Sequence, residues 1–247
     1  MNSIFDLHVH TNQGSPDSAL APEELVEEAV RIGLTGAMVT EHNGWPRHSF
    51  EQFREGKGVV LVRALEVYTP LGHIITLGLE SHVPGLSSGL DAVRMLRKEV
   101  ERVGGFMILA HPFRFLFDPP GMYQNILFEK PADMPRTPEE GAKHPVYELV
   151  DEIEVVNGGN IELENRFAQV VTQVLGWWGT GGSDAHSVNG LGKGATLFKG
   201  EIRHENDLLE ALREGDYVPI EGFHVGRTTY YGKDSARWDA SVFELPR

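Results

Sequence analysis

The sequence predicts an α/β protein in which a mainly parallel sheet is covered by helices. Short β-rich runs alternate with amphipathic helical segments along most of the 247 residues, an order typical of parallel sheets because parallel strands need a crossover between them. Potential ligands of the His, Asp and Glu types follow successive strands. Residues 115–147 are rich in Pro and Gly and lack a sustained period. We therefore expect a single domain over residues 1–247, with an irregular rim insertion at about 115–147.

The first predicted unit is a strand, a helix and a second strand. Ile4–His10 alternates between apolar and polar side chains, which is the period of a strand, and places His8 and His10 on its polar face. Pro22 fits the first position of the following helix and Gly33 its end. The run "GAMVTEH" then predicts the second strand.

The same alternation continues toward the C-terminus. Further strands are predicted over residues 59–67, 73–79, 106–111, 151–157 and 179–184, further helices over 90–103, 162–175 and 206–214, and a terminal hairpin within 223–238.

Composition excludes several classes of function. The formal net charge of −14 argues against a long nucleic-acid partner, which needs a basic face. With no cysteine, any metal must be held by His, Asp and Glu. Neither a signal peptide nor an apolar run of membrane-spanning length is apparent, so the sequence predicts a soluble cytoplasmic protein without a membrane partner. It leaves the oligomeric state open.

Potential ligands gather at the carboxyl ends of the predicted strands, where the loops of a parallel sheet or barrel build the active site. The spacing of His8 and His10, two residues apart on one strand, lets both imidazoles reach one metal. The strand-end residues are His8, His10, His42, Glu66, His111, Asn157, Asp184 and His186.

Each of these residues alone also has an ordinary structural explanation. A single H-x-H is more often incidental than a metal site, Asp184 could begin a helix as its N-cap, and Glu66 could be an exposed strand end. Their common position after successive strands favours a shared metal cluster.

Five motifs resemble, in order and nearly end to end, the PHP (polymerase and histidinol phosphatase) superfamily of metal-dependent phosphoesterases: "DLHVHT", "TEHNG", "LEVYT", "LAHPFR" and "GGSDAH". The resemblance implies a distorted (β/α)7 TIM-like barrel with two or three divalent ions, usually Mn, Zn or Fe. It assigns the first metal to His8, His10 and Asp184, with Glu66 bridging to a second metal held by His111 and His73, and the third metal to His42, His186 and an acid of the first loop.

That first-loop acid departs from the family pattern. The family commonly has an Asp five residues after the second His, whereas Asp17 comes seven residues after His10. Counted back from Pro22, Asp17 falls where the family's Asp does, so the resemblance assigns it to the third metal. "TEH" in place of the commoner "TDH" keeps His42 and puts Glu41 on the opposite face of the strand.

The expected reaction is hydrolysis of a phosphomonoester by a hydroxide that bridges the metals, with no other catalytic side chain needed. Arg114 is expected to bind the phosphate through its planar guanidinium. A small nucleotide, or the terminal nucleotide of a short oligonucleotide, is the favoured substrate. Histidinol phosphate is the close alternative.

Two other classes are weighed against this interpretation. Amidohydrolases also open with H-x-H on a barrel strand, but the bridging Glu66 and the terminal "SDAH" argue against them. A catalytically silent metal-binding regulatory module should lack ligands, and the sequence offers a candidate at every position.

Overall fold

The computed structural model describes residues 2–119, 122–128, 130 and 133–232, which form ten strands of one mixed sheet in the order β10-β9-β8-β1-β2-β3-β4-β5-β6-β7. The strands are β1 (Ser3–Val9), β2 (Gly36–Glu41), β3 (Val60–Thr69), β4 (Gly72–Leu77), β5 (Phe106–Leu109), β6 (Glu152–Asn157), β7 (Thr180–Gly182), β8 (Gly194–Phe198), β9 (Tyr217–Glu221) and β10 (Thr229–Tyr230). The α-helices are α1 (Pro22–Ile32), α2 (Arg47–Arg54), α3 (Gly89–Arg102), α4 (Pro138–Gly141), α5 (Glu162–Leu175) and α6 (Glu205–Glu214).

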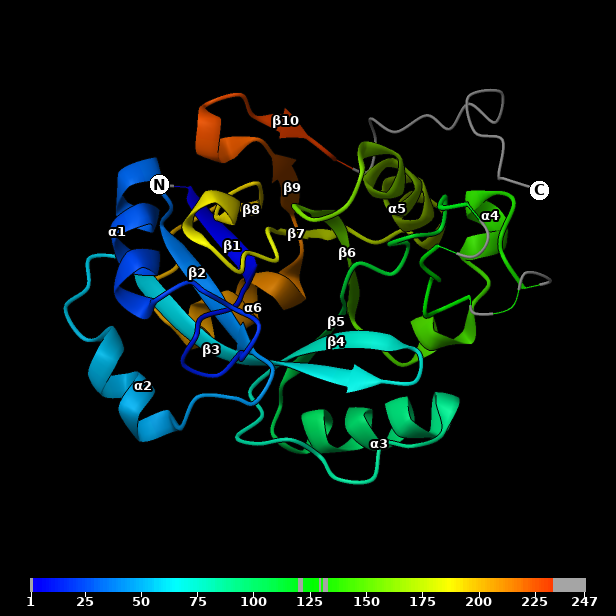
Figure 1. Cartoon of the computed structure of the whole chain (residues 1–247), viewed down its shortest axis with the longest axis horizontal. Coiled ribbons are helices and arrows are strands. Elements are labelled where there is room, and N and C mark those ends of the chain that lie inside the picture. Colours follow the sequence, from blue (N-terminus) through cyan, green and yellow to red (C-terminus); the bar gives the residue numbers. More distant parts are fainter. Residues whose placement is uncertain (1, 120–121, 129, 131–132, 233–247) are drawn as a thin grey trace.

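The sheet curls until its last strand in the order returns to β1. The backbone N–H of Asp184, just after β7, donates to the carbonyl of His8 at 2.7 Å, and His10 N–H donates to the carbonyl of Ala185 at 3.0 Å. Val9 and Ala185 form a parallel bridge. Helices α1, α2, α3 and α5 lie on the outside of this curled sheet (Figure 1). The carboxyl ends of β1 and β7 therefore meet at one place.

The sheet is mixed rather than mainly parallel as predicted. Strands β1, β2 and β3 are parallel, and so are β5, β6 and β7, but β4 runs antiparallel to both of its neighbours. No helix separates β3 from β4, because the chain turns back within "PLG" between Thr69 and Gly72. Strands β8 to β10 add an antiparallel extension. The regular strand–helix repeat of a (β/α)7 barrel is thus interrupted in the described residues.

Helix α1 has the ends that its sequence predicts. Pro22 occupies the first turn, where a missing N–H costs no hydrogen bond. Glu24 accepts a hydrogen bond from the backbone N–H of Ala21 at 3.0 Å. Gly33 ends the helix in the left-handed conformation, with φ of 84°, which glycine adopts without steric cost.

Four of the helices and strands in the described residues were not predicted: α2, α4, β8 and β9. Helix α2 is only 8 residues long, too short for a sustained helical period. Strands β8 and β9 are 5 residues each and contain Gly194 and Pro219, which weaken a strand signal. These strands form because they pair with β1 and with each other.

The predicted rim insertion contributes to the core. In its described part, Leu116, Leu127, Phe128, Val146 and Tyr147 are buried and join the cluster around α3 and α5. The segment also contains the short helix α4. In the described residues it is therefore a packed layer beside the sheet.

The tail only partly matches the predicted terminal hairpin. Strand β10 pairs antiparallel with β9, with Thr229 opposite Glu221. The rest of the predicted hairpin, from residue 233 onward, lies outside the described residues.

The polar face of β1 is buried along with its apolar face. Asp6, His8 and His10 are each 0% exposed, so this face points into the molecule and not toward solvent. Buried polar groups need partners, and Asp6 accepts hydrogen bonds from the backbone N–H groups of Ser183 and Gly192.

None of the helices in the described part of the chain has both the length and the apolar character that a membrane span requires.

Glu152 on β6 predicts a measurable pH dependence of stability. Its Oε2 accepts hydrogen bonds from Trp178 N–H and from the Tyr217 hydroxyl, both at 3.1 Å. Burial raises the pKa of Glu152 to about 7 from its ordinary value of 4.5. Between these two pH values the folded state holds a proton that the unfolded state releases, so the free energy of unfolding falls as pH rises.

Glu152→Gln should remove this loss, because glutamine stays neutral. Relative to wild type, the variant should gain about 2 kcal/mol in the free energy of unfolding between pH 5 and pH 8. Denaturant titrations of both proteins at the two pH values would measure it. A stability difference that does not change with pH would contradict the raised pKa.

Candidate metal centre

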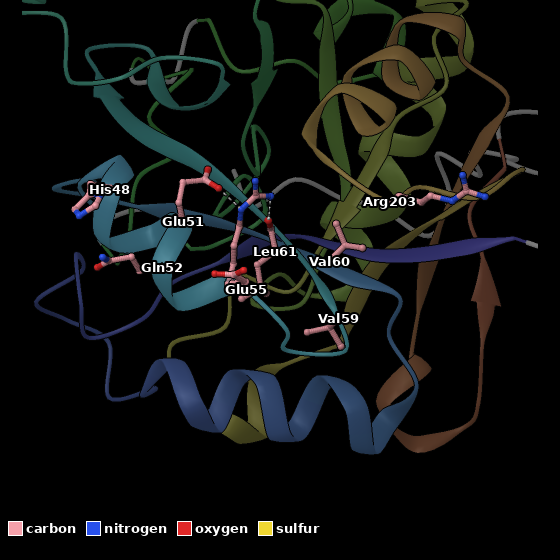
Figure 2. A pocket seen from close by; sticks show the side chains of 9 residues that line it. His48, Glu51, Gln52, Glu55, Val59, Val60, Leu61 and Arg203 are labelled. Atoms are coloured by element: carbon pink, nitrogen blue, oxygen red, sulfur yellow. Dashed lines mark hydrogen bonds and ion pairs between the residues drawn. The ribbon is translucent and has the colours of Figure 1, made fainter.

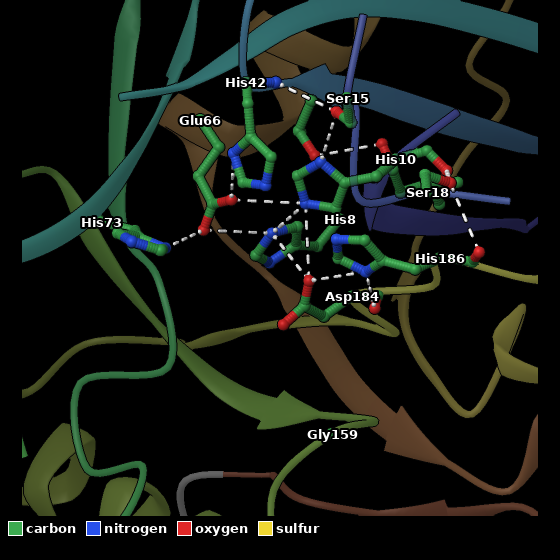
Figure 3. Close-up of polar contacts among 12 residues, drawn as sticks. His8, His10, Ser15, Ser18, His42, Glu66, His73, Gly159, Asp184 and His186 are labelled. Atoms are coloured by element: carbon green, nitrogen blue, oxygen red, sulfur yellow. Dashed lines mark hydrogen bonds and ion pairs between the residues drawn. The ribbon is translucent and has the colours of Figure 1, made fainter. Parts of the chain in front are cut away.

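Glu66, near the end of β3, lies at the centre of a cluster of five imidazoles, and Figure 3 labels four of them, those of His8, His10, His42 and His73. Its Oε1 is 3.3 Å from His8 Nε2, 2.9 Å from His73 Nδ1 and 3.2 Å from His111 Nε2. Its Oε2 is 3.3 Å from both His10 Nε2 and His42 Nδ1. One carboxylate with both oxygens facing imidazoles has the arrangement that a bridging ligand requires.

His8 of β1 and His10, directly after this strand, meet Asp184 on the other side of the cluster. His8 Nε2 and His10 Nε2 lie 3.0 Å apart. Asp184 Oδ1 is 3.5 Å from the first of these nitrogens and 3.4 Å from the second. The structure thus brings together the residues predicted to hold the first metal.

His73 and His111 complete a second group with Glu66. The three residues offer ligand atoms that all lie within 4.8 Å of one another. His73 comes from β4, which pairs antiparallel with β3, so the hairpin carries this histidine back to the end of β3. His111 follows β5, next to β4 in the sheet.

Asp17, the first-loop acid, lies beside the two remaining histidines. Its Oδ2 is 3.3 Å from His42 Nε2 and 3.4 Å from His186 Nε2. The loop is held in place by the Ser18 hydroxyl, which donates to the carbonyls of His10 and His186. The later position of Asp17 in the sequence therefore does not separate it from the other predicted ligands of the third metal.

The protonation states of several groups suit metal binding. Burial by itself would raise the pKa values of Glu66 and Asp184, but His8 and the other imidazoles hold both well below their ordinary ranges. Burial lowers the pKa of His42 and of His111, with His10 adding to the first shift and Arg114 to the second. Ionised carboxylates and neutral imidazoles are the forms that bind cations. Burial by itself would lower the pKa values of His8 and His10, but the neighbouring carboxylates raise both, so these two imidazoles would release a proton on binding a metal.

Two glycines of β7 allow Asp184 to reach the cluster. A Cβ on Gly182 would lie 2.4 Å from the Cβ of His8, and one on Gly181 would lie 2.2 Å from the carbonyl oxygen of Ala195. Larger residues would push β7 away from β1 and β8. The run "GTGGSD" is therefore needed for close packing as well as for its acid, and Asp184 does not begin a helix.

Backbone strain is concentrated here. In the described part of the chain, three of the four non-glycine residues with positive φ belong to the cluster or its rim: His111 at 30°, Asp184 at 54° and Phe115 at 63°. Side chains rarely adopt this conformation, and such residues persist where surrounding contacts hold them, often at functional sites.

Arg114 lies next to Asp184 and is half-buried. Its Nη2 donates to Asp184 Oδ2 at 2.7 Å and to Asn157 Oδ1 at 2.6 Å, and its Nε donates to Asn160 Oδ1 at 3.0 Å. These bonds orient Asp184 so that its other oxygen faces His8 and His10. Among the described residues Nη1 makes no hydrogen bond, so its N–H groups are available to a phosphate oxygen.

Glu41 and Ser15, for which the sequence predicted no role in the cluster, support His10. The Ser15 hydroxyl donates to Glu41 Oε2 at 2.6 Å and lies 3.1 Å from His10 Nδ1. Glu41 also accepts hydrogen bonds from the backbone N–H and the hydroxyl of Thr11. Glu41 therefore faces the first loop and fixes the position of a predicted ligand. The position of this acid next to His42 in "TEH" was the sequence feature from which its role could have been predicted.

Glu154 on β6 supports His8 in the same way and was also missed. Its Oε1 is 3.0 Å from His8 Nδ1, and its Oε2 accepts hydrogen bonds from His111 N–H and Asn157 Nδ2, both at 2.8 Å. An Nδ1–H donated to this carboxylate leaves the lone pair of His8 Nε2 directed at the cluster. Two acids alternating within the otherwise apolar run "EIEVVN" were the signal, because buried acids need partners.

Glu154→Gln should lower the affinity for divalent metal by about 10- to 100-fold, because an amide N–H facing Nδ1 favours the wrong tautomer of His8. Metal titration of the purified variant would measure the change. Glu152→Gln is a matched control, since Glu152 lies two residues earlier on β6 and contacts Trp178 and Tyr217 instead. Equal metal affinity in Glu154→Gln and wild type would remove Glu154 from this role.

A second hollow, on another part of the surface, does not bring together a set of metal ligands comparable to that around Glu66. It has a volume of about 460 Å³ and lies against α2 (Figure 2). Arg54 on its wall donates to Glu51 at 2.6 Å and to the carbonyl of Leu61. It shares no lining residue with the metal cluster.

Comparison with known proteins agrees with the motifs. The profile of the PHP-associated family matches residues 162–217. An uncharacterized protein of Methanocaldococcus jannaschii is 30% identical over 119 residues, which are 44% of this chain and 67% of that protein. The error-prone DNA polymerase of Mycobacterium bovis is 30% identical over 105 residues, 38% of this chain, but the match spans only 9% of the polymerase.

Two solved structures share the fold. A two-domain protein from Bacteroides vulgatus containing a predicted PHP-like metal-dependent phosphoesterase superposes with a TM-score of 0.62 at 23% identity, over 89% of this chain and 64% of the other. Endonuclease Q, in complex with a 27-mer duplex carrying an abasic lesion, superposes with a TM-score of 0.56 at 14% identity, over 88% and 58% of the two chains. Together with the family profile, the archaeal relative and the five motifs around the cluster, this likeness identifies the chain as a member of the PHP superfamily of metal-dependent phosphoesterases.

Proposed function

We propose that this protein is a metal-dependent phosphomonoesterase. The observation that carries the proposal is the convergence of imidazoles and carboxylates in four overlapping groups, each with ligand atoms within 4.8 Å of one another. Nitrogen and carboxylate oxygen donors without thiolates suit Zn, Mn and Fe. The donor set therefore fits two or three divalent ions held by His8, His10, Asp17, His42, Glu66, His73, His111, Asp184 and His186.

Bound divalent ions would supply a water of lowered pKa and would neutralise the charge that develops on the phosphate. The side chains of the protein position the metal ligands and contact the phosphate. Glu154 and the Ser15–Glu41 pair hold His8 and His10 in place, and Arg114 keeps one oxygen of Asp184 turned toward the cluster. The Arg114 Nη1 is the protein's own candidate contact to a phosphate oxygen.

A small phosphorylated substrate, and among these a nucleotide, is the proposed class. The net charge of −14 supports this choice, because a duplex needs many cationic contacts along its backbone. The likeness to endonuclease Q, which was solved with a DNA duplex, raises the opposite possibility and runs against the expectation of no long nucleic acid. Histidinol phosphate and a catalytically silent regulatory role remain the alternatives to test.

One experiment separates these functions. The purified protein is reconstituted with Mn or Zn, its metal content is measured, and it is offered nucleoside mono- and bisphosphates, histidinol phosphate, short oligonucleotides and an abasic duplex. Hydrolysis of mononucleotides with at least two metals per chain is the expected result. A preference for histidinol phosphate or for the duplex would replace the proposed substrate. A metal-loaded protein inert toward every phosphoester would support the regulatory role.

A further inference from the structure

A small side pocket opens beside the second group of candidate ligands. It has a volume of about 120 Å³ and shares His73, His111 and Arg114 with the metal cluster and its rim. The rest of its wall is mainly apolar. We define the apolar wall of the side pocket as Leu71, Pro112, Phe115, Ile126 and Leu127.

Apart from Leu71, the wall comes from two segments, residues 112–115 and 126–127, which hydrogen bonds hold together. The buried Asn125 donates from Nδ2 to the carbonyls of Pro112 and Arg114, both at 2.8 Å, and its Oδ1 accepts from Phe128 N–H at 2.9 Å. Phe115, held at a φ of 63°, donates its N–H to the buried Glu164 of α5. Phe115 also stacks on Tyr123, with ring centroids 4.8 Å apart. Specific hydrogen bonds and ring stacking therefore fix the part of the wall that the insertion contributes.

The size of the pocket limits what can enter it. An engineered apolar cavity of about 150 Å³ in another protein binds benzene, so about 120 Å³ admits one ring or a short aliphatic chain. A fused two-ring system would exceed it. The apolar wall favours a group without charges or many hydroxyls, because burying unpaired polar groups is costly.

We propose that the side pocket receives the organic group esterified to the phosphate, and that it selects esters whose first group is a single apolar ring. A phosphate held at the cluster would place its ester oxygen next to His73 and His111, which also line the pocket. This inference rests on the proposed phosphomonoesterase function, but it favours an ester of an apolar ring over the nucleotide proposed above, because the phosphate of a nucleotide is esterified to a hydroxylated ribose.

The test uses esters whose leaving groups have similar acidity, namely methyl, benzyl and 2-naphthylmethyl phosphate, with metal-reconstituted full-length protein. Benzyl phosphate should have a kcat/KM at least about 10-fold above that of methyl phosphate, and the naphthyl ester should fall back toward the methyl ester. Benzyl phosphonate, which is not hydrolysed, should bind at least about 10-fold more tightly than methyl phosphonate in calorimetry.

Ile126 offers variants that change the pocket and leave the cluster alone. Ile126→Trp should fill the pocket and remove the benzyl advantage while methyl phosphate hydrolysis persists. Ile126→Ala should enlarge it and improve the naphthyl ester. Val30→Trp, at a 55% exposed position on α1, is the control for adding a large ring.

Equal kcat/KM values for the methyl and benzyl esters, or an equal effect of Ile126→Trp on both, would overturn the inference. Absence of hydrolysis of all three esters, with tight and ring-dependent phosphonate binding, would instead count against the catalytic proposal.

Discussion

Glu66→Gln is expected to abolish phosphoester hydrolysis and to reduce the bound metal below two ions per chain. Glutamine keeps the shape of the side chain but loses the charge, and its amide nitrogen cannot act as a ligand to the imidazole-bound ions. Glu66 lies within 3.3 Å of five imidazoles, so no other carboxylate can take its place. Replacing a residue that only hydrogen-bonds to a metal ligand already lowers metal affinity or activity by about 10- to 100-fold. The loss of activity in Glu66→Gln should therefore exceed about 100-fold.

Elemental analysis and a phosphatase assay on the same preparation would measure both effects. Glu210→Gln, at an exposed position on α6, is the matched control and should leave metal content and activity unchanged. Full metal content in Glu66→Gln would show that Glu66 does not bridge the ions.

His10→Ala is expected to abolish hydrolysis while the fold persists. The imidazole has Nε2 3.3 Å from Glu66 and 3.4 Å from Asp184, and it stacks on His42 and His186 with ring centroids 4.4 Å from each. Its removal therefore disturbs the first and the third groups of ligands. The apolar side chains of β1, Phe5, Leu7 and Val9, are untouched, so the sheet should remain folded.

Activity, metal content and circular dichroism would be compared with those of His48→Ala, which removes an exposed imidazole on α2. Activity retained in His10→Ala would remove His10 from the catalytic centre. An unfolded variant would be replaced by His10→Gln, which preserves more of the side-chain volume, and the same comparison would apply.

Local pattern was enough to locate the strand ends and the residues after them. The alternation in Ile4–His10 reflects the two-residue period of a strand, which depends on backbone geometry alone. Pro22 and Gly33 act through their own backbone preferences, so the bounds of α1 were predictable. For the same reason, His8, His10 and Asp184 could be proposed as neighbours once their strands were recognised.

The direction of each strand in the sheet could not be predicted from local sequence pattern. The connection between β3 and β4 is short, and so are the strands β8 and β9. The pairing of these strands is decided by which partner offers a free edge and a matching face. The sequence therefore suggested a parallel sheet where the structure has a mixed one. The core role of the insertion was missed for a related reason: Leu127 and Phe128 are buried by contacts with distant segments and follow no period.

The sequence by itself determined the chemistry of this protein: a set of imidazoles and carboxylates without cysteine, placed after successive strands. Tertiary structure decided which of them meet. It placed Asp17 beside His42 and His186, and Glu154 and Glu41 behind His8 and His10, and it closed a ring-sized pocket next to His73 and His111. The physical reason is that ligand identity is a property of single residues, whereas orientation and enclosure depend on contacts between segments far apart in the chain.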